Sequence, residues 1–296
     1  EGSSSVNPLD FILMIEGALL FTGSVSRKLC SGGTSKSVFP FTVFSAAVGC
    51  SMDGVKDSKD ARGEVWLPVW PNFARIEEIS HILKEGRAEL GGKQASSSVD
   101  VARSIASLGV DRGIQSFVRY GFLKRNGKAF LATPLGRFNV RAQSETGLLL
   151  EIDRWLNRFR RASADENAPP RFGSALRRIE SAIFNYCQYG GGSRFSEILC
   201  SLGQAERELS VGEKFRHDNK IRPIVNLSSE WLQAVSDNFP EFELALALSG
   251  IYDSEFKIGP LRSNLEPVGA DRRGGASSNW VEKDRAVVWN SRNLVS

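Results

Sequence analysis

The chain has 296 residues, a formal net charge of +4 and an ordinary composition, with 41% hydrophobic and 24% charged residues. This composition excludes collagen-like and intrinsically disordered proteins, and the length suffices for one large core or two to three smaller ones. The four cysteines (Cys30, Cys50, Cys187 and Cys200) form no CxxC pair and no metal-ligand spacing. They indicate buried thiols in a reducing compartment, so the sequence predicts a cytoplasmic protein without a disulfide framework.

The N-terminal part is expected to mix helix and strand. Asn7-Pro8 is a good N-cap and first-turn pair for a helix that runs through Phe21. The apolar run 11–21 is interrupted by Glu16 and is too short to span a bilayer, and neither a basic region nor a cleavage site marks a signal peptide. We therefore expect no membrane partner. Strands are predicted at 38–48 and 63–70, followed by a helix from Ile76.

The segment Ser98–Arg141 is predicted to form helix, turn, helix and β-hairpin. Ser98 is an acceptable N-cap for the first helix, whose apolar residues recur at helical spacing. Apolar spacing from Ile114 predicts a second helix that ends at Gly121. Asn126-Gly127, between two short strand-like runs, is the strongest short hairpin signal. Two helices followed by a hairpin outline a winged helix.

Positive charge is concentrated in this element. Val99–Arg141 contains eight Lys or Arg and two Asp, a balance of +6 that exceeds the charge of the whole chain. A basic winged helix commonly lies on a nucleic-acid backbone. The sequence therefore predicts phosphate contacts from Arg112, Arg119, Lys124, Arg125, Lys128, Arg137 and Arg141. The alternative is a small α+β subdomain whose cations only solvate its surface.

The aromatic residues of the same element can either stack on bases or pack in the core. Phe117 and Phe130 are expected in the core, because Phe is usually buried. The sequence does not decide the place of Tyr120. Phe122 has the same two alternatives, although its spacing favours the packed side.

The second half of the chain is predicted to be helical, with helices at 174–188 and 193–209 and a short strand at 286–289. A helix at 146–161 carries a second, weaker basic patch that includes Arg154 and Arg158. A polar, proline-containing linker at 163–173 is expected to separate a mixed α+β region, 1–162, from a helical region, 174–250, and 251–296 is expected to be an irregular tail with short strands. The predicted fold class is α+β, predominantly helical, with a winged-helix-like element and small antiparallel sheets.

The sequence offers little for catalysis. His81 and His217 are the only histidines and lie far apart, whereas a hydrolytic metal site needs clustered ligands. His217-Asp218 alone does not make a metal phosphohydrolase. The glycine-rich segment 32–37 lacks the GxxxxGK[ST] spacing of a phosphate loop. We therefore expect a protein that is not an enzyme and holds no cofactor.

Several motifs in order along the chain resemble the large subunit of the type I-U CRISPR effector complex, now called type I-G. The longest are LGVDRGI at 108–114, RYGF at 119–122, RNG at 125–127 and ATPLGR at 132–137. Others are NPLDF at 7–11, EGALLF at 16–21, FPF at 39–41, RGEVWLP at 62–68, AIF at 182–184 and AVVW at 286–289. Members of this family are longer, so the chain resembles an internal or C-terminal portion of one.

The resemblance implies a non-catalytic subunit of a guide-RNA surveillance complex in antiviral defence. Such large subunits recognise the short motif beside the target, stabilise the R-loop and recruit the helicase–nuclease. The implied partners are guide RNA, target DNA, the backbone and processing or cap subunits of Cascade, and the helicase–nuclease. In RNA-guided effectors base pairing reads the sequence, while protein handles the backbone and the displaced strand. Two alternatives remain open, namely a protein–protein scaffold without nucleic-acid contact and a winged-helix DNA-binding regulator.

Overall fold

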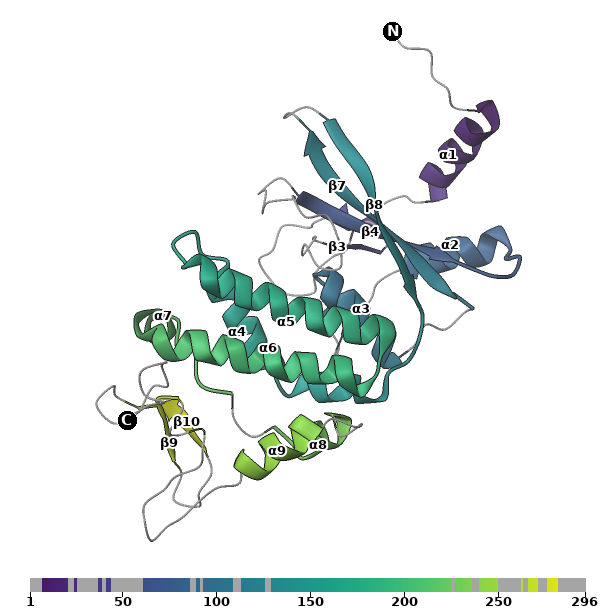
Figure 1. The fold of residues 1–296 in the computed structure, drawn as a ribbon. Coiled ribbons are helices and arrows are strands. Elements are labelled where there is room, and N and C mark those ends of the chain that lie inside the picture. The colour runs from purple at the N-terminus through teal and green to yellow at the C-terminus, as the bar shows by residue number, and fades with distance from the viewer. Residues whose placement is uncertain are drawn as a thin grey trace. The chain divides into compact units, whose positions relative to one another are not determined.

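The computed structural model describes residues 7–20, 24–25, 37–38, 41–43, 61–85, 89–90, 93–108, 113–125, 129–224, 227–235, 240–249, 262, 266–270 and 276–281. The chain divides into two compact units, 1–142 and 143–296 (Figure 1). As the sequence predicts, the fold is α+β and predominantly helical, with a small four-stranded antiparallel sheet. Within the described ranges, no helix has both the length and the apolar character needed to cross a bilayer.

The first unit is built around one antiparallel sheet. Its strand order is β3-β4-β7-β8, with the bounds β3 (Thr42–Val43), β4 (Ala61–Val69), β7 (Ser116–Arg125) and β8 (Ala129–Asn139). Two short strand pairs accompany it, β1 (Ser24–Val25) with β2 (Ser37–Val38) and β5 (Glu89–Leu90) with β6 (Lys93–Gln94). The helices are α1 (Pro8–Leu20), α2 (Ile76–Glu85) and α3 (Ser98–Leu108). The strand predicted at 63–70 is therefore confirmed as β4.

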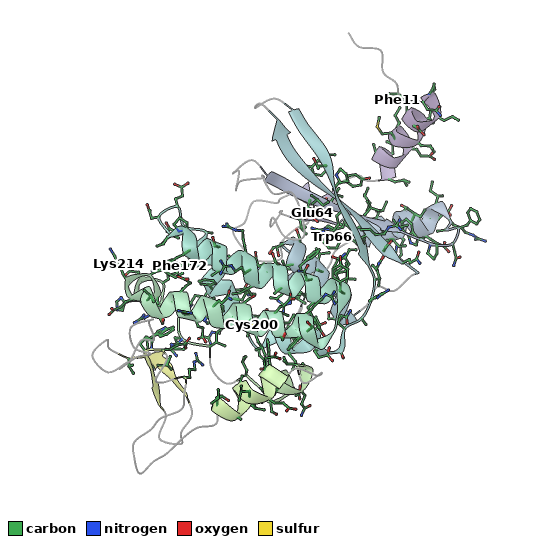
Figure 2. All side chains as sticks on the ribbon, viewed as in Figure 1. Phe11, Glu64, Trp66, Phe172, Cys200 and Lys214 are labelled. Carbon is green, nitrogen blue, oxygen red and sulfur yellow. The ribbon has the colours of Figure 1, made fainter. Side chains whose placement is uncertain are left out.

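Helix α1 begins as predicted. The side-chain oxygen of Asn7 accepts a hydrogen bond from the backbone N–H of Leu9 at 3.1 Å, and Pro8 is the first helical residue. None of the residues of α1 is buried, and its large apolar side chains, such as Phe11 (labelled in Figure 2), are exposed. This helix therefore adds no residue to the apolar core of the first unit.

The prediction of a second helix within the 98–141 element is wrong. Helix α3 begins at Ser98, so its N-cap is Ser97 and not Ser98 as predicted, since the Ser97 hydroxyl accepts from the backbone N–H of Asp100 at 3.2 Å. Residues 116–120 belong to strand β7, which pairs with β4 and β8. From Phe117 to Phe122 along β7, buried and partly exposed residues alternate one by one, which is the period of a strand. Pairing on both sides imposes this period on a run whose apolar spacing also fits a helix. The described residues form one helix followed by a hairpin, and a winged helix is not confirmed.

One face of the sheet forms the apolar core of the first unit. Trp66, Phe117 and Phe138 are at most 2% exposed. The ring centroid of Trp66 lies 6.1 Å from that of Phe117 and 5.3 Å from that of Phe138. The predicted core position of Phe117 is thus confirmed, whereas the side chain of Phe130 lies outside the described part of the structure.

A buried ion pair lies on the same face of the sheet. Glu64 is 0% and Arg119 is 3% exposed, and the Nε of Arg119 donates to Oε1 of Glu64 at 2.5 Å. The Ser98 hydroxyl, at the start of α3, donates to Oε2 of Glu64 at 2.5 Å. The Arg119 guanidinium also lies 4.9 Å from the ring centroid of Trp66, which Figure 2 labels with Glu64 on β4. These contacts join β4, β7 and α3.

The second unit is mainly helical. It contains the 3₁₀ helix η1 (Ser144–Leu150) and the helices α4 (Asp153–Ser163), α5 (Pro170–Tyr189), α6 (Gly192–Val211), α7 (Glu213–Asp218), α8 (Glu230–Val235) and α9 (Pro240–Ser249). The strands β9 (Val268–Ala270) and β10 (Ala276–Trp280) pair antiparallel. The helices predicted at 174–188 and 193–209 are confirmed as α5 and α6. The helix predicted at 146–161 is divided into η1 and α4, and the strand predicted at 286–289 lies outside the described residues.

The segment 163–173 is not the boundary that the sequence suggests. It connects α4 to α5 inside the second unit, and the chain divides between Ala142 and Gln143 instead. Phe159 of α4 packs edge-on against Phe172 of α5, with ring centroids 6.4 Å apart. Arg160 donates to the Glu180 carboxylate at 2.8 Å. The polar composition of the segment reflects an exposed helix connection, because the helices on either side of it share a core.

Arg262, which precedes strand β9, forms an ion pair with Glu206 of α6. One terminal nitrogen of Arg262 donates to both carboxylate oxygens of Glu206, each at 2.7 Å. Burial raises the pKa of Glu206 to about 7, against the opposing effect of the Arg262 charge.

Gly212, which ends α6, is required by close packing. A β-carbon at this position would lie 2.5 Å from Cζ of Phe172, whose ring stacks on Phe215 at a centroid distance of 3.9 Å. We expect Gly212→Ala to lower the free energy of unfolding by about 1–3 kcal/mol, because the stacked ring cannot move aside without strain. Urea unfolding followed by circular dichroism measures the change.

The matched control for this prediction is Gly203→Ala, in the interior of α6. A β-carbon there meets no atom within 4 Å. Alanine should therefore stabilise the helix by about 0.5–1 kcal/mol. Equal effects of the two substitutions would contradict the packing explanation.

Candidate nucleic-acid interface

The predicted hairpin is confirmed, and it is longer than expected. Strands β7 and β8 pair from Ser116 opposite Asn139 to Arg125 opposite Ala129. The connecting residues 126–128 lie outside the described part of the chain. A β-bulge lies between Arg119 and Tyr120. Pro134 occupies the outermost strand of the sheet at this bulge, where the missing N–H of proline costs least.

The hairpin carries positive charge without any acidic residue. Between Ser116 and Asn139 the sequence contains five bases, Arg119, Lys124, Arg125, Lys128 and Arg137, and no Asp or Glu. The neighbouring strand β4 supplies Glu64, whose carboxylate is paired with Arg119. The sequence of this hairpin therefore carries an excess of positive charge.

The residues predicted to contact phosphates differ in their exposure. Arg137 and Arg141 are exposed, as a phosphate contact requires. Lys124 and Arg125 end strand β7, and their side chains lie outside the described part of the structure, as do residues Arg112 and Lys128. Arg119 does not agree with its predicted role, because its guanidinium is buried against Glu64 and Trp66.

Two aromatic side chains lie on the opposite face of the sheet from the core. Successive residues of a strand point to opposite faces, so Tyr120 and Phe122 face away from Phe117. Both are partly exposed, in contrast to Phe117, which is 2% exposed. The sequence left Tyr120 undecided and favoured a packed position for Phe122. The alternation of Val118, Tyr120 and Phe122 with Arg119 would place these apolar side chains on the buried face, whereas the structure buries Arg119.

The second basic patch lies on α4. Arg154 and Arg158 lie one turn apart on α4, and both are exposed. One terminal nitrogen of Arg158 donates to the backbone carbonyl of Lys220 at 2.7 Å. Arg160 belongs to the interior side of the same helix, where it pairs with Glu180. The patch therefore offers Arg154 and Arg158 to solvent, as predicted.

The described part of the second unit includes hollows in its surface. The larger, of about 970 Å³, lies between the 165–171 segment and α7 and is lined by charges of both signs, including His217 and Asp218. Nδ1 of His217 lies 3.6 Å from Oδ1 of Asp218, and both side chains are more than half exposed. Among the described residues, no three His, Cys, Asp or Glu gather where a metal ion would bind.

Comparison with known proteins adds no assignment. No protein-family model matches the chain, and no curated protein matches it.

Proposed function

We propose that this chain binds nucleic acid without catalysing a reaction, as part of the large subunit of a type I-G CRISPR effector complex. In this role it works in the cytoplasm with guide RNA, target DNA, the other Cascade subunits and the helicase–nuclease. It contributes to target binding, flanking-motif recognition, R-loop stabilisation and nuclease recruitment. The sequence motifs quoted above support the choice of complex.

One observation carries the nucleic-acid part of the proposal. The β7–β8 hairpin contains five bases and no acid, and the buried Glu64 of β4 pairs with one of these bases, Arg119. An unbalanced basic hairpin suits phosphates, because each phosphate contact releases condensed counterions. The proposed contacts are Lys124, Arg125, Lys128 and Arg137 of the hairpin, with Arg112 and Arg141 beside it and Arg154 and Arg158 as a second, weaker patch.

The salt dependence of binding tests this proposal. We expect the triple variant Lys124→Gln, Arg125→Gln, Arg137→Gln to bind nucleic acid more weakly and to reduce the log–log salt slope by about 2–3, since each lost contact removes about 0.7–0.9. The slope is measured by fluorescence anisotropy with labelled duplex and single-stranded oligonucleotides, at salt concentrations between about 50 and 200 mM.

The matched control is Arg178→Gln on α5, an exposed arginine of the second unit that contacts Gln204 at 3.3 Å. Its salt slope should equal that of the parent chain. An unchanged slope in the triple variant would remove the hairpin from the interface. A chain that binds no duplex, single-stranded DNA or RNA at physiological salt would favour the alternative, a protein–protein scaffold.

Co-purification with the other type I-G subunits and guide RNA tests the choice of complex. We expect the chain to enter the complex and target-duplex opening to fall when the chain is omitted. Opening that is unimpaired without it would contradict the proposed role.

A further inference from the structure

We propose that the outer face of the β7–β8 hairpin is a stacking platform for single-stranded nucleic acid, on which Tyr120 and Phe122 each take one base. This inference rests on the proposed function and narrows its ligand from nucleic acid in general to unpaired strands.

The register of the sheet places the two rings side by side on one face. Tyr120 and Phe122 are two residues apart on β7, a separation of about 7 Å along the strand. Each lies between a residue of β4 and a residue of β8, and directly opposite residues share a face. The rings are therefore close enough to act together and far enough apart to take separate bases.

The neighbours of these rings are small. Phe122 lies between Gly63 of β4, which has no side chain, and Ala132 of β8, whose side chain is a single methyl group. Tyr120 lies between Val65 and Pro134. Since no large side chain lies directly across from Phe122 on either strand, neither cross-strand partner can cover its ring.

The other face of the hairpin shows the contrast. There, Phe117 is opposite Pro68 and Phe138, and its ring contacts those of Phe41 and Trp66 with centroids 5.6 and 6.1 Å away. Phe117 is a core residue with aromatic neighbours, whereas Tyr120 and Phe122 are partly exposed. The sheet thus has one packed aromatic face and one face on which the aromatic rings are partly exposed, beside Val65, which is 7% exposed.

Cationic residues stand at both ends of the aromatic row. Arg137 is exposed and lies opposite Val118, two positions before Tyr120 in β7. Lys124 follows Phe122 by two positions in β7. Proteins that bind single strands combine aromatic rings, on which bases stack, with cations that hold the backbone. In a duplex the base faces are already stacked, so the rings select for unpaired strands.

Removing the bases while keeping the phosphates tests the platform. The full chain is titrated with labelled oligothymidylate and with an abasic oligonucleotide that has the same number of phosphates. We expect the chain to bind oligothymidylate at least about 30-fold more tightly, because two bases stack. An oligouridylate of equal length determines whether the platform distinguishes RNA from DNA.

Two variants separate stacking from charge. Tyr120→Leu with Phe122→Leu keeps apolar volume but removes the rings, so it should bind both oligonucleotides with the affinity of the parent chain for the abasic one. Arg137→Gln should weaken both by the same factor. If the parent chain binds both oligonucleotides equally, the platform is wrong although the proposed function stands. If it binds neither, the proposed function itself fails.

If the leucine variant does not fold, photo-crosslinking of the parent chain tests which residues contact the bases. Oligonucleotides with 5-iodouracil should crosslink the parent chain at Tyr120 or Phe122, as identified by mass spectrometry. Crosslinks confined to other residues would overturn the assignment.

Discussion

Replacing Arg119 with methionine will lower the free energy of unfolding of the first unit by about 3–5 kcal/mol, because the substitution leaves the Glu64 carboxylate buried without its cation. Glu64 is 0% exposed and receives hydrogen bonds from Arg119 and Ser98, both at 2.5 Å. Hydrogen exchange measured by mass spectrometry should show faster exchange in β4 and β7. Loss of protection confined to the hairpin end would contradict this expectation.

Two further variants check that the cost comes from the unpaired charge. Replacing both partners, Glu64→Met with Arg119→Met, should recover much of the lost stability, because an apolar pair has no charge to desolvate. Ser98→Ala removes one hydrogen bond and should cost about 1 kcal/mol. If the double variant is less stable than Arg119→Met alone, the ion pair is not the source of the effect.

The same substitution distinguishes a structural from a binding role for Arg119. If this arginine contacted a phosphate, its replacement would reduce the salt slope of binding by about 0.7–0.9 and leave stability nearly unchanged. The buried position predicts the reverse. Residual folded protein should therefore bind nucleic acid with the salt slope of the parent chain.

Replacing Phe195 with alanine will lower the stability of the second unit by about 3–5 kcal/mol, because the cavity lies in a packed aromatic cluster. Phe195 is 0% exposed, and its ring centroid lies 5.1 Å from that of Tyr186 and 5.0 Å from that of Trp231. The cluster joins α5, α6 and α8, so its loss should accelerate hydrogen exchange in all three helices. Thermal and urea unfolding give the magnitude.

Val211→Ala, at the C-terminal end of the same helix, is the matched control. Val211 is 62% exposed, so its substitution should change stability by less than about 0.5 kcal/mol. Because the chain divides at Ala142, exchange in β4 and β7 should be unaffected by Phe195→Ala. Faster exchange there would show that the two units unfold together.

The boundary between the units illustrates what composition cannot predict. The segment 163–173 is polar and contains prolines, features of a linker, yet Phe172 inside it and Phe159 before it belong to one core. The true boundary at 142–143 has no comparable signal in the sequence. Where a domain ends depends on which apolar faces meet, and composition does not record that.

Local patterns of the sequence determined the elements that depend on near neighbours. Asn7-Pro8 started α1, helical spacing defined α5 and α6, and the run around Asn126-Gly127 set the hairpin, since capping and turn preferences act within a few residues. Only the tertiary structure decided that residues 116–120 form a strand, because pairing with β4 outweighs their helical spacing. The same pairing buries Arg119 beside Glu64 and leaves Tyr120 partly exposed, since a strand sends alternate side chains to opposite faces of its sheet.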